Sequence, residues 1–144
     1  MTLLAASTDL PLILHVGGAM VLVGALACAA VLLLAAARAD GGTDHLRVGM
    51  RTLLWGAIPS FVVMRVGAEW TASEANVDDD AAWIGIGYMT SDAGALLLII
   101  ATVLAAVAAR RGVAGGRARW AAGLSLFMIA AYAVALWAMT TKPV

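Results

Sequence analysis

Three ionic residues, Arg65, Glu69 and Asp92, lie in or at the edge of segments that otherwise read as membrane-spanning. A charged side chain in the hydrocarbon is costly, so such residues usually face the bundle interior, pair with another charge and mark a functional site. Glu69 follows Arg65 by four residues, which places both side chains on one helix face. The spacing therefore predicts an ion pair of Arg65 with Glu69, or with Asp92 across two helices.

Further polar and aromatic side chains fall in the same half of the membrane when about 20 residues are counted outward along each span. We therefore expect an outward-facing polar pocket walled by four helices. Its candidate ligand-binding residues are His15, Arg65, Glu69, Tyr88, Asp92, Tyr132 and Trp137. In this pocket Arg65 would receive an anionic group or balance the charge of Asp92. Glu69 and Asp92 would tune Arg65, or would take up protons.

The same ionic side chains are open to three interpretations. They could form a salt bridge that only fixes helix register, since a desolvated pair is very costly to break. They could hold a ligand or an ion. They could also snorkel to the membrane surface without any role.

The composition requires a membrane protein. Of the 144 residues, 63% are hydrophobic and only 12% are charged, whereas soluble domains are about half apolar and about a quarter charged. Four apolar stretches near the length of a bilayer crossing account for the excess. We predict an all-α fold in a single domain, residues 1–144: an antiparallel, up-down transmembrane four-helix bundle with spans at about 10–37, 48–70, 81–109 and 118–140. Pro59 should kink the second span.

Basic residues set the expected orientation. Seven arginines flank the first and third loops: Arg38, Arg47, Arg51, Arg110, Arg111, Arg117 and Arg119. The second loop holds Glu74 and Asp78–Asp80 and no base. By the positive-inside rule, the first and third loops are cytoplasmic and both termini are extracytoplasmic. The expected location is the inner membrane of a bacterial cell, crossed several times.

Catalysis and cofactors have little support in the sequence. The chain shows no nucleophile–base arrangement, phosphate loop or dinucleotide motif, so an enzyme is the less favoured class and no cofactor is required. His15 is a weak candidate metal ligand, because the only other histidine, His45, falls at the opposite membrane face. The net charge of zero gives no indication of a nucleic-acid partner.

The segment 14–24, LHVGGAMVLVG, resembles the first helix of small bacterial integral membrane proteins of the copper-resistance D type. The segments 64–70 and 83–94 are similar to parts of an uncharacterised actinobacterial four-span family. The first resemblance implies metal handling, with His15 as the transferable ligand. Both imply antiparallel helical pairs.

These observations favour a protein that binds, and could transport, a small solute or ion in the outward pocket. Transport would require a homo-oligomer, because four helices leave little room for a pathway. A structural or accessory subunit of a larger membrane complex is the first alternative. A membrane metal or redox protein is the second.

Overall fold

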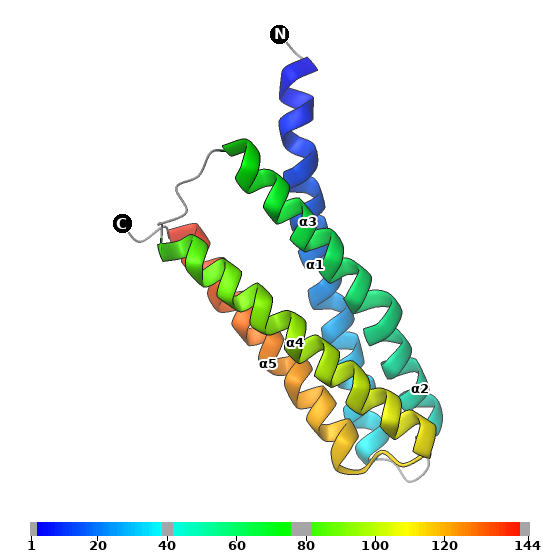
Figure 1. The fold of residues 1–144 in the computed structure, drawn as a ribbon. Coiled ribbons are helices and arrows are strands. Elements are labelled where there is room, and N and C mark those ends of the chain that lie inside the picture. Colours follow the sequence, from blue (N-terminus) through cyan, green and yellow to red (C-terminus); the bar gives the residue numbers. More distant parts are fainter. Residues whose placement is uncertain (1–2, 39–41, 76–81, 142–144) are drawn as a thin grey trace.

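The computed structural model describes residues 3–38, 42–75 and 82–141, and these segments are helical apart from short connections. The elements are α1 (Leu3–Arg38), α2 (Thr43–Arg51), the π-helix η1 (Thr52–Ala57), α3 (Ile58–Ala75), α4 (Ala82–Arg111) and α5 (Gly115–Thr141). Figure 1 shows α2 and α3 running back along α1, and α5 running back along α4. The all-α prediction is confirmed.

Among the described residues, three stretches are long and apolar enough to cross a membrane: Leu10–Arg38, Gly87–Arg111 and Gly115–Ala138. They correspond to the first, third and fourth predicted spans. The second predicted span, 48–70, lies inside the uninterrupted helical stretch from Thr43 to Ala75. Its α3 part, Ile58–Ala75, carries Arg65, Glu69 and Glu74, so length and composition alone do not make it a span.

The element boundaries extend beyond those predicted. Helix α1 begins at Leu3 rather than near residue 10, and the second helical stretch extends past the predicted span at both ends. The three consecutive aspartates of the second loop lie outside the described residues.

The irregularity expected at Pro59 takes the form of a widened turn just before it. The proline has no N–H to offer the carbonyl of Trp55. The preceding segment Thr52–Ala57 is a π-helix, in which the Ile58 N–H donates to the carbonyl of Leu53, five residues back. Such π-bulges are an established cause of bends in helices.

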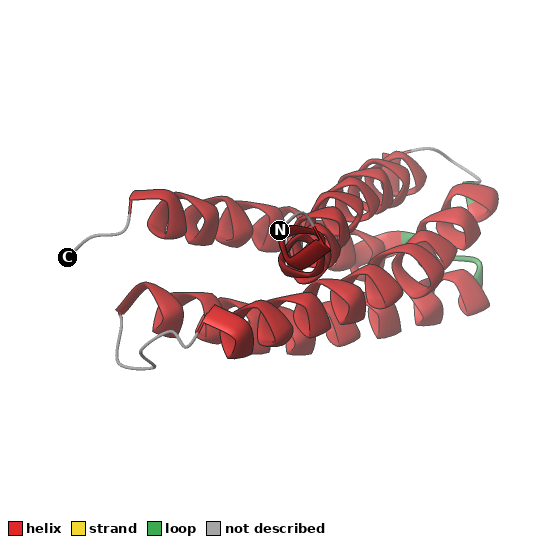
Figure 2. Cartoon of the chain, turned by 90° about the horizontal axis from the view of Figure 1, so that it is seen from above, coloured by secondary structure: helices red, strands yellow, loops and turns green. Residues whose placement is uncertain are grey.

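Small residues form the core of the bundle. Helix α1 buries Leu22, Leu26, Ala29 and Leu33, and the facing surfaces of α4 and α5 bury mainly alanines. Helix α1 packs along both α3 and α5, and α4 packs along α5. By contrast, α3 contacts α4 only sparsely. In Figure 1 the C-terminal end of α3 and the N-terminal end of α4 diverge toward the upper part of the view. Figure 2, which looks down on the bundle from above, shows α1 end-on between its neighbours.

Helices α1 and α3 cross with their backbones nearly in contact. A Cβ atom on Gly18 would lie 2.6 Å from the backbone nitrogen of Met64, and one on Gly67 would overlap the backbone nitrogen of His15. Small residues permit this approach, which is the usual basis of helix association in lipid. The crossing fixes the position of α3, and therefore of Arg65, relative to α1.

Replacing Gly67 with alanine should force the two helices apart, since the added methyl group meets rigid backbone. We expect Gly67→Ala to lower the free energy of unfolding by about 1–3 kcal/mol, a typical cost of overpacking. Gly24→Ala is the matched control, because a Cβ there would meet nothing within 4 Å. Denaturation in mixed micelles, followed by tryptophan fluorescence, measures both. Equal stability of the two variants would contradict the close crossing.

Candidate functional site

Four of the predicted site residues form one interacting group, termed the Arg65 cluster: Arg65, Glu69, Tyr88 and Asp92. The Arg65 Nη2 atom lies 3.1 Å from Glu69 Oε1 and 3.3 Å from Asp92 Oδ1. The Tyr88 hydroxyl donates to Glu69 Oε2 at 3.1 Å. The guanidinium also stands 4.8 Å from the centre of the Tyr88 ring, within range of a cation–π interaction. Both of the ion pairs that the sequence offered as alternatives are present.

The cluster has an excess of negative charge. One guanidinium faces two carboxylates, and no second cation pairs with either carboxylate in the described part of the chain. The Arg65 side chain is 27% exposed, whereas those of Glu69 and Asp92 are 51% and 72% exposed. The positive centre is therefore covered, and the negative groups lie at the surface of the bundle.

The cluster is also the main link between α3 and α4. These helices contact each other sparsely, yet the Arg65–Asp92 ion pair and the Tyr88–Glu69 hydrogen bond both run between them. Tyr88 and Asp92 are one turn apart on α4, as Arg65 and Glu69 are on α3, so two matching helix faces meet. Polar contacts replace the apolar packing that joins the other neighbouring helices.

The remaining predicted residues lie in different surroundings. His15 Nδ1 is hydrogen-bonded to the carbonyl of Met64 at 3.0 Å, so its ring belongs to the α1–α3 crossing. Tyr132 lies over Gly94, where its hydroxyl would overlap a Cβ atom. Trp137 is 65% exposed on α5. The structure therefore brings together four of the seven residues and places the other three elsewhere.

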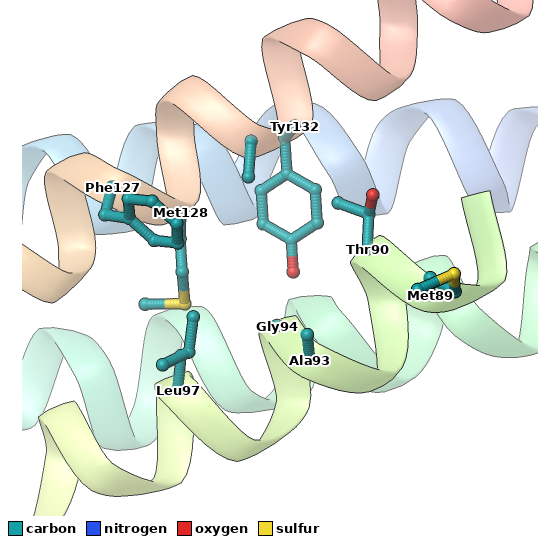
Figure 3. A pocket seen from close by; sticks show the side chains of 9 residues that line it. Met89, Thr90, Ala93, Gly94, Leu97, Phe127, Met128 and Tyr132 are labelled. Carbon is teal, nitrogen blue, oxygen red and sulfur yellow. The ribbon is translucent and has the colours of Figure 1, made fainter. Parts of the chain in front are cut away.

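The polar pocket expected between four helices differs from the cavity that the structure contains. A cavity of about 240 Å³ lies between α4 and α5, and Figure 3 shows its lining. The lining residues are Met89, Thr90, Ala93, Gly94, Leu97, Phe127, Met128, Ala131 and Tyr132. Of the predicted site residues only Tyr132 borders it. The cavity forms there because small residues, among them Ala93, Gly94 and Ala131, face the larger side chains.

The described segments show no candidate metal site. In them, no three His, Cys, Asp or Glu side chains are grouped closely enough to hold a metal ion.

No protein-family model matches the chain, and neither curated proteins nor solved structures give a significant match. The function must therefore be inferred from the geometry of the chain itself.

The Tyr88–Glu69 hydrogen bond should contribute measurably to stability. We expect Tyr88→Phe and Glu69→Gln each to destabilise the bundle, and the double variant to lose less than the sum. The predicted coupling energy is about 1 kcal/mol, the net contribution of a typical hydrogen bond. Unfolding in mixed micelles measures the cycle. Strictly additive losses would show that the hydrogen bond contributes nothing.

Proposed function

We propose that this chain is an integral membrane protein that binds a small cation at the Arg65 cluster. One observation supports the proposal above the others: two carboxylates share a single guanidinium, and Asp92 is 72% exposed. The cluster therefore carries a formal charge of −1 at a place where a cation can approach it. No enzymatic role is proposed.

The charge balance favours a cation over the anionic ligand that Arg65 alone suggests. An anion at the guanidinium would lie beside both carboxylates and would be repelled by them. A cation instead neutralises the excess charge without breaking either ion pair. Coulomb attraction at about 4 Å is worth about 1 kcal/mol in water and about 4 kcal/mol at the effective dielectric constant of a protein surface.

Transport of the cation would need further copies of the chain or a larger complex. Neighbouring helices of one copy are joined by an alanine-rich core, and the bundle of one copy leaves little room for a pathway. We propose that a homo-oligomer supplies the pathway, with the Arg65 cluster at its outer entrance.

An accessory subunit of a larger membrane complex is the second candidate. It is favoured by the observation that Arg65 pairs with both carboxylates, as a purely structural network would require. Under this alternative the Arg65 cluster only holds α3 against α4, and removing its charge would unfold the bundle.

We propose further that the stretch from Thr43 to Ala75 is a fourth span, so that both termini are extracytoplasmic in the inner membrane. On a Cys28→Ser background, Ser73→Cys and Thr140→Cys should react with an impermeant maleimide in intact cells. Gly116→Cys should react only after lysis. Thr43→Cys, at the start of α2, decides between four spans and three. With four spans it lies on the opposite membrane face from Ser73→Cys and reacts only after lysis, whereas with three spans the two positions lie on the same face and react alike.

Cation binding should appear as thermal stabilisation of the protein in lipid nanodiscs. Sodium or potassium chloride should raise Tm by about 3–6 °C relative to the chloride of a bulky organic cation at equal ionic strength. Asp92→Asn should abolish this rise, because it removes the exposed charge. Arg65→Met should strengthen cation binding about tenfold, because the competing guanidinium is gone.

The matched control is Glu74→Gln. Glu74 accepts a hydrogen bond from Trp70 on the same helix, so the variant removes an α3 carboxylate without touching the Arg65 cluster. It should keep the full response to sodium or potassium. A bundle that unfolds in Arg65→Met, with no cation response in the wild type, would instead identify the structural subunit.

A further inference from the structure

The connection between α4 and α5 carries a concentrated positive charge. Residues 110–120, termed the α4–α5 turn, hold four arginines and no acidic residue, a formal charge of +4. The arginines are Arg110, Arg111, Arg117 and Arg119, and all four are exposed. None of them forms an ion pair within the described part of the chain. The turn therefore presents a charge that the described chain leaves uncompensated.

The exposed apolar surface of α4 and α5 ends at this turn. On α4, Val103 is exposed, and the exposed Arg110 follows it by two turns on the same face. On α5, Phe127 and Trp120 are exposed with the same separation, and Trp120 lies at the end next to the arginines. Both helices contain stretches long and apolar enough to cross a membrane. The change from apolar side chains to arginine, with a tryptophan beside it, is typical of the level of the lipid headgroups.

The residue types of the turn favour phosphate as the group that is bound. A guanidinium offers a planar pair of N–H donors that matches two phosphate oxygens. Clusters of about four or more basic residues beside a membrane span are typical of sites for acidic lipids. A phospholipid with a net negative charge compensates the turn, whereas phosphatidylcholine also brings an ammonium group that the arginines repel.

Two exposed apolar side chains favour a lipid over a soluble anion. Val113 lies within the turn and is 66% exposed, and Trp120 is 70% exposed. A soluble phosphate would leave both in contact with water. The chains of a lipid whose headgroup is bound by the arginines would cover both, which adds the free energy of apolar burial to the attraction between the charges.

Other arginines at the same end of the bundle provide a comparison. A Cβ atom on Gly112 would lie 3.8 Å from Thr43 Cγ2, so the turn lies beside the start of α2. In Figure 1 the yellow-to-orange connection lies at the lower end of the view, near α2. Helix α2 carries Arg47 and Arg51, and Arg47 lies 3.9 Å from the Asp44 carboxylate. Part of the charge on α2 is therefore compensated, unlike that of the turn.

We propose that the α4–α5 turn is a binding surface for the headgroup of an acidic phospholipid of the surrounding bilayer. The guanidinium groups bind the phosphate, and Val113 and Trp120 contact the upper part of the acyl chains. Asp92 of the Arg65 cluster lies about 27 Å away from Arg110 along α4, at about 1.5 Å per residue. The inference goes beyond the proposed cation binding and does not depend on it.

The probe is phosphatidylglycerol brominated near the top of its acyl chains, and brominated phosphatidylcholine is its control. Bromine quenches tryptophan fluorescence at short range, so the quenching that is lost in Trp120→Phe reports on this surface. The protein is placed in phosphatidylcholine nanodiscs at physiological salt, which screens charges beyond about 8 Å. The wild type should prefer phosphatidylglycerol at least about fivefold, the gain expected from one arginine near an acidic lipid surface.

Arg110→Gln combined with Arg119→Gln should bring the occupancy of the two lipids close to equal. The matched control is Arg47→Gln combined with Arg51→Gln, which removes the same charge from α2 and should keep the preference. Each variant is measured with and without Trp120, so that the same tryptophan reports in every case. If the paired glutamine variant does not fold, Arg110→Gln and Arg119→Gln are tested singly, and each should lower the preference.

Equal occupancy of the two lipids in the wild type would overturn the proposal. An equal loss of preference in the α2 control would overturn it too, because only the overall charge of this end would then attract the lipid. Inorganic phosphate should not displace the brominated phosphatidylglycerol; if it does, the turn is a site for a soluble anion and the proposal is wrong. Asp92→Asn should leave these results unchanged, which separates this test from that of the cation site.

Discussion

The link between α3 and α4 depends on one guanidinium held between two carboxylates. Arg65 reaches Glu69 on its own helix and Asp92 on the neighbouring one, at 3.1 and 3.3 Å. Elsewhere the bundle is joined by small apolar side chains, which allow close contact and a large gain from dispersion. Between α3 and α4 such packing is sparse. The interaction that joins these helices is therefore mainly polar.

Two pairs of helices in this bundle are held together by different kinds of contact. Helices α1 and α3 are held by a backbone crossing at Gly18 and Gly67, which tolerates no added atom. Helices α4 and α5 pack against each other along an alanine-rich face. Helix α1 also packs along α5, so the two pairs share one core. The Arg65 cluster adds a polar link between α3 and α4, where that core is thinnest.

The sequence predicted those features that follow from spacing along one helix or from the length of apolar segments. Helical class, three of the spans and the Arg65–Glu69 pair were accessible because they depend on local periodicity and on the cost of charge in lipid. The Arg65–Asp92 pair was accessible only as an alternative, since it depends on how two helices face each other. The cavity was missed because it depends on small residues on α4 facing Tyr132 across the interface. The π-turn before Pro59 was visible only as an expected irregularity.

Four of the seven residues predicted to share one pocket lie together in the Arg65 cluster and three lie elsewhere, for a physical reason. A polar group in a bundle must be satisfied by the nearest donor or acceptor, because its desolvation is not compensated at a distance. His15 finds the carbonyl of Met64 at 3.0 Å on the neighbouring helix, and Arg65 finds two carboxylates. Their hydrogen-bonding capacity is used locally, and neither remains to line a shared cavity. Among the buried side-chain oxygens and nitrogens of the described segments, only the hydroxyls of Tyr132 and Ser91 stay unpartnered. The polar side chains are thus paired within neighbouring helices rather than gathered around one pocket.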